Sequence, residues 1–155
     1  MSKKAAPTSL LRLEAFLPYR LNVIAATVSE GLARVYSDRF GITIPEWRVI
    51  ATLGQFGQVT AKAIGLHSRM HKTKVSRAVA ALDARELVQR LANPDDKREA
   101  FVSLTMAGEG IYRDILPLAE DYEARLLGVL NMQERADLDR LLNALAKEAE
   151  TLLLR

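Results

Sequence analysis

Residues 59–105 constrain the fold of this chain more than any other segment. Two short helical patterns are separated by a tight turn near residues 67–70, and two strand-like runs with a charged loop between them follow. This order of elements is typical of a winged helix-turn-helix, in which the second helix lies in the major groove of DNA. We therefore predict a helix-turn-helix followed by a hairpin, the wing.

The second helix, residues 71–85, has one apolar stripe and one polar face. The stripe repeats at i, i+3, i+4 and i+7 and predicts a face turned to the core; its members are Val75, Ala78, Val79 and Leu82. The opposite face is basic and hydroxylated, with small alanines, and such side chains can approach base edges and phosphates. Base contacts are predicted for Thr73, Lys74, Ser76 and Arg77, and phosphate contacts for Ser68, Arg69 and Lys72.

Local signals delimit the first helix and the wing. Thr60 is placed to cap a short helix over residues 61–66. Residues 93–96, Asn-Pro-Asp-Asp, are a strong turn signal between strand-like runs at 87–92 and 99–104. Arg98 follows this turn, and an arginine at a hairpin tip suits a narrow minor groove. We expect Asp96 to orient the Arg98 guanidinium.

Positive charge is concentrated in the same segment. Residues 62–98 contain nine Lys or Arg and four Asp or Glu, whereas the rest of the chain contains thirteen and fifteen. Binding to DNA requires basic side chains that neutralise phosphates. A solvated basic face on an ordinary helical domain is the alternative interpretation, but the order helix, turn, helix and wing favours DNA binding.

These residues resemble the multiple-antibiotic-resistance regulator (MarR) family of bacterial transcription factors. The similarity extends over essentially the whole chain and is carried by Lys74-Val75-Ser76-Arg77, Leu82, Leu87-Val88, Arg90, Asp96-x-Arg98, Val102-x-Leu104-Thr105 and Gly108. The resemblance implies a mainly α fold with a small β-hairpin wing and long N- and C-terminal dimerisation helices. It also implies a homodimeric repressor on a pseudo-palindromic operator, released by a small-molecule effector.

Two residues depart from the family pattern. His71 stands where the family often has a helix-capping Asp, and either a phosphate contact or a spacer role is open to it. Glu86 stands where a Gly commonly ends the recognition helix. A left-handed Glu costs about 1 kcal/mol more than Gly. We therefore expect a different backbone path at Glu86 or a small loss of stability.

The whole chain, residues 1–155, is predicted to be a single MarR-like domain. The winged helix-turn-helix covers 43–105, and the dimerisation helices cover 10–40 and 106–155. Helix boundaries, breaks or bends are expected at Pro18, Gly41, the Thr43–Glu46 capping box, Thr105, Pro117 and the Asn131–Glu134 capping box. Apolar side chains near both ends could pack within the chain or form an interface, and the resemblance favours a two-fold dimer.

Composition excludes several other classes of protein. The chain has no cysteine, no apolar run of membrane-spanning length and no signal-peptide pattern, so we expect a cytoplasmic protein without disulfides. No catalytic motif is present, so neither an enzyme nor a cofactor is predicted. His67 and His71 have a metal-compatible spacing, but they flank the predicted turn without a further ligand, so no metal site is predicted.

The resemblance places an effector pocket where the dimerisation helices meet the winged helix-turn-helix. Candidate lining residues are Phe16, Tyr19, Arg20, Val23, Tyr36, Trp47 and Arg48. Aromatic side chains beside an arginine suit an aromatic carboxylate, and residues 17–21 and 45–48 resemble a subgroup that controls aromatic-acid catabolism, some of whose members respond to coenzyme A thioesters. Ordinary core packing and salt bridges are the simpler interpretation of each residue taken singly.

Two other functions remain compatible with the sequence. One is a ligand-independent architectural protein that coats DNA with little sequence preference. The other is a helical ligand carrier or enzyme with an incidental basic patch.

Overall fold

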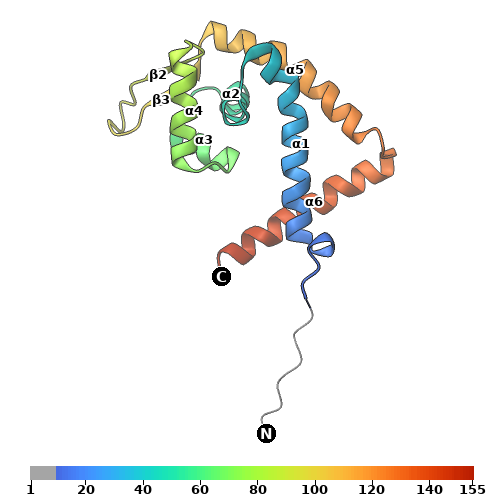
Figure 1. Ribbon diagram of the computed structural model, residues 1–155. Helices are drawn as coiled ribbons and strands as arrows, with labels where there is room; N and C mark the ends of the chain where they lie inside the picture. Colours follow the sequence, from blue (N-terminus) through green and yellow to red (C-terminus); the bar gives the residue numbers. More distant parts are fainter. Residues whose placement is uncertain (1–9) are drawn as a thin grey trace. The chain divides into compact units, whose positions relative to one another are not determined.

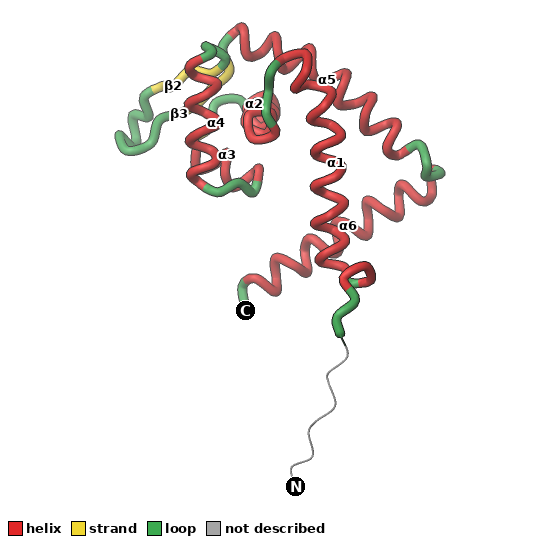
Figure 2. The backbone as a smooth tube through the Cα atoms, in the orientation of Figure 1, coloured by secondary structure: helices red, strands yellow, loops and turns green. Residues whose placement is uncertain are grey.

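The computed structural model describes residues 10–155, so residues 1–9 of the predicted domain lie outside the described residues. The described chain is mainly helical with one small sheet (Figures 1 and 2). Its elements are η1 (Leu13–Ala15), α1 (Leu17–Phe40), α2 (Ile44–Phe56), β1 (Val59–Thr60), α3 (Ala61–Ser68), α4 (Lys72–Ala84), β2 (Val88–Leu91), β3 (Phe101–Leu104), α5 (Met106–Leu127) and α6 (Met132–Leu153). They form two compact units that divide between Arg113 and Asp114, within α5.

Helix α1 ends where the sequence predicts, but it begins at Leu17 and not near residue 10. Pro18 lies in its first turn, where the missing N–H has no partner to lose, and the short η1 precedes it. Gly41 ends the helix with a φ of 63°, and its N–H donates to the Ser37 carbonyl. The expected interruption at Pro18 is therefore a restart of the helix after η1.

Helix α2 opens with the predicted capping box. The Glu46 N–H donates to the Thr43 hydroxyl at 3.3 Å, and the Thr43 N–H donates to the Glu46 carboxylate at 2.9 Å. Helix α2 then buries Val49, Ile50 and Leu53 in the core of the first unit. This reciprocal cap satisfies two backbone groups that the first turn would otherwise leave without partners.

The predicted helix-turn-helix is confirmed as α3, a turn and α4. Thr60 caps α3 by accepting the Ala63 N–H at 3.2 Å. Arg69 turns the chain with a φ of 53°, and the Met70 N–H closes the turn on the Gly65 carbonyl. All four members of the predicted apolar stripe of α4 are buried; they are Val75, Ala78, Val79 and Leu82.

The wing belongs to a three-stranded antiparallel sheet with the order β1-β3-β2. Val88 pairs with Leu104 across the hairpin, and Val59 pairs with Val102 on the other side of β3. Both hairpin strands are shorter than predicted. Strand β1 is not predicted from the sequence, because two residues are too few to display the alternation that marks a strand.

Glu86 takes up the left-handed conformation, so of the two expected outcomes the different backbone path is wrong and the small loss of stability stays a prediction. Its φ is 56°. The Leu87 N–H donates to the Leu82 carbonyl and the Glu86 N–H donates to the Asp83 carbonyl, which is the Schellman arrangement at the end of a helix. Leu82 and Leu87 occupy the two positions that often make an apolar contact in this arrangement, and both are buried.

The start of α5 is tied to the end of α4. The Thr105 hydroxyl donates to the Glu86 carbonyl at 2.6 Å and accepts the Gly108 N–H at 3.1 Å, as expected of a capping residue. Gly108 is required there because a Cβ would overlap the Leu87 carbonyl. The segment Glu86–Leu87, which ends α4, therefore also positions the first turn of α5.

The second unit, residues 114–155, consists of the rest of α5 and α6. Helix α5 continues through Pro117, and Asn131 opens α6 with the predicted capping box to Glu134. Several large apolar side chains of α6 are exposed, among them Leu141, Leu142, Leu145, Leu152 and Leu153. No helix within residues 10–155 is long and apolar enough to cross a membrane.

We expect Glu86→Gly to stabilise the protein, because glycine adopts the left-handed conformation without a Cβ penalty. The gain should be about 1 kcal/mol, since relief of strain exceeds the extra entropy that glycine loses on folding. Urea unfolding monitored by circular dichroism would measure it. Glu86→Ala is the matched control, because alanine keeps the Cβ; an equal gain in both variants would contradict the strain at this position.

Candidate nucleic-acid interface

The outer face of α4 carries the side chains predicted to reach bases. Lys72, Thr73, Lys74, Ser76 and Arg77 are all exposed. They lie opposite the buried stripe of the same helix, so packing of that stripe turns them to solvent. The face holds three cations and two hydroxyl groups on just over one and a half turns of helix.

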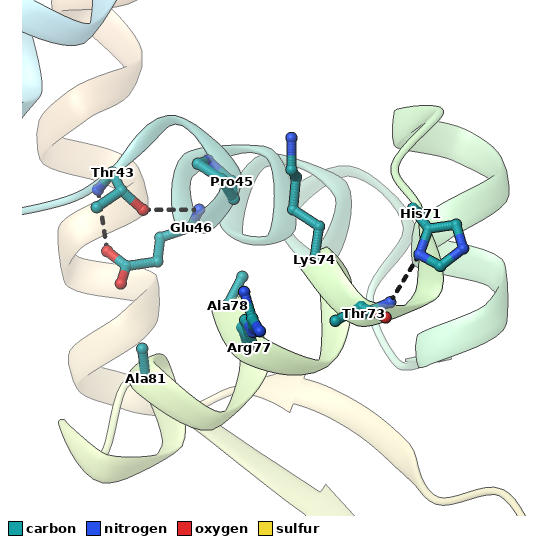
Figure 3. Close-up of a pocket in the computed structure, with 9 residues that line it drawn as sticks. All are labelled: Thr43, Pro45, Glu46, His71, Thr73, Lys74, Arg77, Ala78 and Ala81. Carbon is teal, nitrogen blue, oxygen red and sulfur yellow. Dashed lines mark hydrogen bonds between the residues drawn. The ribbon is translucent and has the colours of Figure 1, made fainter.

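A groove of about 560 Å³ separates this face from the first turn of α2 (Figure 3). Its lining residues are Thr43, Pro45, Glu46, His71, Thr73, Lys74, Arg77, Ala78 and Ala81. Small side chains from α4 leave room in the groove, and its lining cations are Lys74 and Arg77. Thr43 and Pro45 are not among the predicted site residues, although the capping box at Thr43 marks a helix N-terminus there.

His71 performs the capping role that an Asp often has in the MarR family, which this sequence resembles. It is the N-cap of α4, and its Nδ1 accepts the Thr73 N–H at 3.3 Å. The dashed line in Figure 3 marks this bond. His71 is therefore more than a spacer in the turn, and α4 begins with a satisfied backbone group at its exposed end.

Ser68 and Arg69 lie in the turn that precedes α4. The Ser68 hydroxyl donates to the Ile64 carbonyl at 2.6 Å, so its proton is used within α3. Arg69 is exposed and supplies the left-handed residue of the turn. The structure thus places both residues beside the N-terminal end of α4.

The tip of the wing is organised by side chains that bind its own backbone. The Asn93 side-chain oxygen accepts N–H groups from Asp95 and Asp96 at 3.0 and 3.3 Å. Asp96 in turn accepts the Arg98 N–H at 2.9 Å, with its carboxylate 4.0 Å from the Arg98 Nε. The Arg98 side chain is 94% exposed, so its guanidinium is held near Asp96 but projects into solvent.

Three aromatic rings cluster beside α2. The Tyr36 ring centroid lies 5.6 Å from that of Trp47, and Trp47 stacks on Tyr112 at 6.3 Å. Burial raises the pKa of Tyr36 to about 12, although the positive charge of Arg48 acts in the opposite direction. The Tyr36 phenol is therefore neutral at physiological pH. Tyr112 is not among the residues predicted from the sequence to line an effector pocket.

The remaining effector candidates lie far from this cluster along α1. From Val23 to Tyr36 the helix rises about 20 Å, at about 1.5 Å per residue. The structure therefore brings together Tyr36, Trp47 and Arg48 but leaves four candidates apart and exposed; these are Phe16, Tyr19, Arg20 and Val23.

The two histidines have separate structural roles. His67 stacks on Phe56 with ring centroids 4.0 Å apart, whereas His71 caps α4. Within residues 10–155 there is no group of three or more His, Cys, Asp or Glu side chains placed to hold a metal ion.

Sequence comparison finds relatives among bacterial regulators. A family model described as the MarR family matches residues 40–99. The transcriptional regulator HosA of Escherichia coli O111:H- is 28% identical over 94 residues, which cover 61% of this chain and 70% of HosA. A regulator from Bacillus subtilis, YwoH, is 31% identical over 90 residues, covering 58% of this chain and 65% of YwoH. For a mycobacterial relative, at 24% identity, the alignment spans 66% of its length, just under two thirds.

Solved structures share the fold over most of the chain. A MarR-family regulator from Silicibacter pomeroyi has a TM-score of 0.76 at 26% identity, covering 88% of this chain and 91% of its own. A MarR/EmrR-family regulator from Acinetobacter sp. ADP1 has a TM-score of 0.83 at 24% identity, covering 91% and 99%. NadR in complex with 4-hydroxyphenylacetate has a TM-score of 0.74 at 23% identity, covering 92% and 99%. The last two show the fold alone.

The helix-turn-helix, the wing and the basic face of α4 together define a winged-helix protein. In sequence and in fold the chain is similar to winged-helix transcriptional regulators of the MarR family. Its curated relatives are regulators and not enzymes.

Proposed function

We propose that this protein is a sequence-specific DNA-binding repressor that acts as a homodimer. The observation that carries the proposal is the exposed, basic and hydroxylated face of α4 above a fully buried stripe. A recognition helix must present polar side chains to base edges while a rigid core holds it at a fixed angle. In this proposal each chain inserts α4 into one of two successive major grooves.

The contacts divide into those that read sequence and those that fix position. We assign base-edge contacts to Thr73, Lys74, Ser76 and Arg77, and phosphate contacts to Ser68, Arg69 and Lys72. Arginine and lysine can donate to guanine O6 and N7, while phosphate contacts fix the register of the protein on the duplex. For Ser68, whose proton is bonded within α3, a phosphate contact requires rotation of its hydroxyl.

The wing is proposed to enter the minor groove through Arg98. Its side chain is exposed at the hairpin tip, and Asp96 holds the local backbone in place. A narrow minor groove has an enhanced negative potential that attracts arginine. A second, separate groove contact would extend the footprint of each chain beyond the reach of α4.

Dimerisation is proposed through the exposed apolar side chains near the two ends of the chain. Leu141, Leu145 and Leu152 are exposed on α6, as are Phe16 and Leu17 near the start of α1. Apolar patches of this kind mark interaction surfaces in soluble proteins. A two-fold dimer would present two recognition helices to half-sites about one helical turn of DNA apart.

The effector is proposed to be an aromatic carboxylate or its coenzyme A thioester. Tyr36 is buried, so the aromatic surface beside the Arg48 cation would come from the half-buried Trp47 ring that packs on it. NadR, which has the same fold, was crystallised with 4-hydroxyphenylacetate. Because Val23 and Tyr36 lie about 20 Å apart along α1, a pocket that contains all seven candidates requires residues from both chains of the dimer.

We expect the protein to bind a duplex from the region upstream of its own gene in preference to a scrambled duplex of equal length. Fluorescence anisotropy at near-physiological salt would measure both affinities, and sedimentation would give the size of the complex. A tight complex of dimer size with the native duplex alone supports the proposal. Equal and steeply salt-sensitive binding to both would instead favour the architectural DNA-coating protein.

Arg98→Ala should weaken operator binding by about 1–3 kcal/mol if the wing makes an ordered groove contact. The same anisotropy titration measures this loss. Lys97→Ala is the matched control, because it removes one positive charge from the neighbouring exposed position. If both variants lose the same affinity, only the net charge of the wing matters and a specific role for Arg98 is refuted.

Aromatic acids and their coenzyme A thioesters should raise the melting temperature and release the protein from DNA. Binding to the folded state alone stabilises a protein by mass action. Differential scanning fluorimetry with 4-hydroxyphenylacetate as the first probe, followed by competition with bound operator, tests this. Trp47→Phe, which keeps an aromatic ring, and Trp47→Ala separate the need for a ring from simple loss of packing. If no member of the series stabilises the protein or releases it from DNA, the effector proposal is refuted.

A further inference from the structure

The cap of α4 determines which nitrogen of His71 carries the proton. Nδ1 accepts the Thr73 N–H at 3.3 Å (Figure 3). A neutral imidazole has one N–H and one acceptor nitrogen, and a nitrogen that accepts a hydrogen bond holds no proton. The neutral His71 side chain in this cap is therefore the Nε2–H tautomer, and Nε2 can only donate.

The Nε2–H group has no partner within the protein as far as residues 10–155 describe it. The His71 side chain is exposed, and among the described residues its one side-chain hydrogen bond is the cap through Nδ1. Its groove neighbours Lys74 and Arg77 are themselves donors, while the Glu46 carboxylate already accepts from Thr43. The Nε2–H group therefore lies at the groove with no acceptor from the described residues.

We propose that His71 is a DNA-binding residue that caps α4 through Nδ1 and donates through Nε2–H to an acceptor on the duplex. The acceptor is a phosphate oxygen or the N7 or O6 atom of guanine, which offer the same hydrogen-bond chemistry. This inference rests on the proposed function. An Asp in this position would also cap α4, but an ionised carboxylate has no proton to donate and repels phosphate. Histidine therefore adds a contact that a capping Asp cannot make.

The two roles of His71 can be separated by substitution. In His71→Asn the side-chain oxygen takes the position of Nδ1 and keeps the cap, but the amide nitrogen ends short of Nε2. In His71→Ala both roles are lost. The Asn variant should keep the melting temperature of the wild type, whereas the Ala variant should melt about 2–4 °C lower, as expected for loss of one helix cap.

Affinity is measured on a duplex that the wild-type protein selects from a random-sequence pool. His71→Asn should bind it about tenfold more weakly for each donor lost, as expected for a hydrogen bond to a charged or strongly polar acceptor. Weakening that is uniform across variant duplexes assigns the acceptor to phosphate, and weakening confined to one base pair assigns it to a guanine edge. Both patterns support the inference.

Two results would overturn it in different ways. If the wild type selects a duplex and His71→Asn binds it equally well, His71 only caps α4 and the proposed function stands. If the wild type selects no duplex, the proposed function fails and the inference fails with it.

The tautomer itself can be observed without DNA. The chain has two histidines, so His67→Asn leaves the signals of His71 alone. Long-range nitrogen–proton correlation spectra of the neutral ring distinguish the two tautomers. The Nε2–H form is expected; the Nδ1–H form would mean that the cap is not made in solution and would refute the inference.

Discussion

Burial of one stripe of α4 is the constraint on which the rest of the winged helix-turn-helix depends. Val75, Val79 and Leu82 are almost completely inaccessible, and the helix packs against α2 and α3. Because side chains repeat every 3.6 residues around a helix, fixing this stripe also fixes which residues face outward. The basic face and the groove beside α2 follow from the packing and need no separate arrangement.

Hydrogen bonds at both ends of α4 fix where the helix begins and ends. His71 caps the start, while the Schellman turn at Glu86 closes the end. Arg85 reaches back to the end of α1, where it donates to the carbonyls of Phe40 and Gly41 at 2.8 and 3.0 Å. These carbonyls would otherwise lack helical partners, so the Arg85 side chain completes the end of α1 and links it to α4.

The sequence predicted local structure well because local structure depends on near neighbours. The capping boxes at Thr43 and Asn131 and the buried stripe of α4 each involve residues within a few positions of one another. The conformation of Glu86 could not be predicted in this way. Its preference opposes the left-handed conformation, but two backbone hydrogen bonds and the buried pair Leu82 and Leu87 outweigh that preference.

The proposed DNA-contact residues could be predicted from the sequence better than the proposed effector residues, because they lie closer together along the chain. Most of the former lie on one helix or one hairpin, so a periodic pattern identifies them together. The aromatic cluster joins Trp47 to Tyr112, which is distant in sequence, and it requires Gly54, since a Cβ there would lie 2.5 Å from the Tyr112 ring. No periodicity encodes such a contact. A ligand that displaced this stacked ring would act on α2, which packs directly against α4, and so would act on the helix that we propose reads DNA.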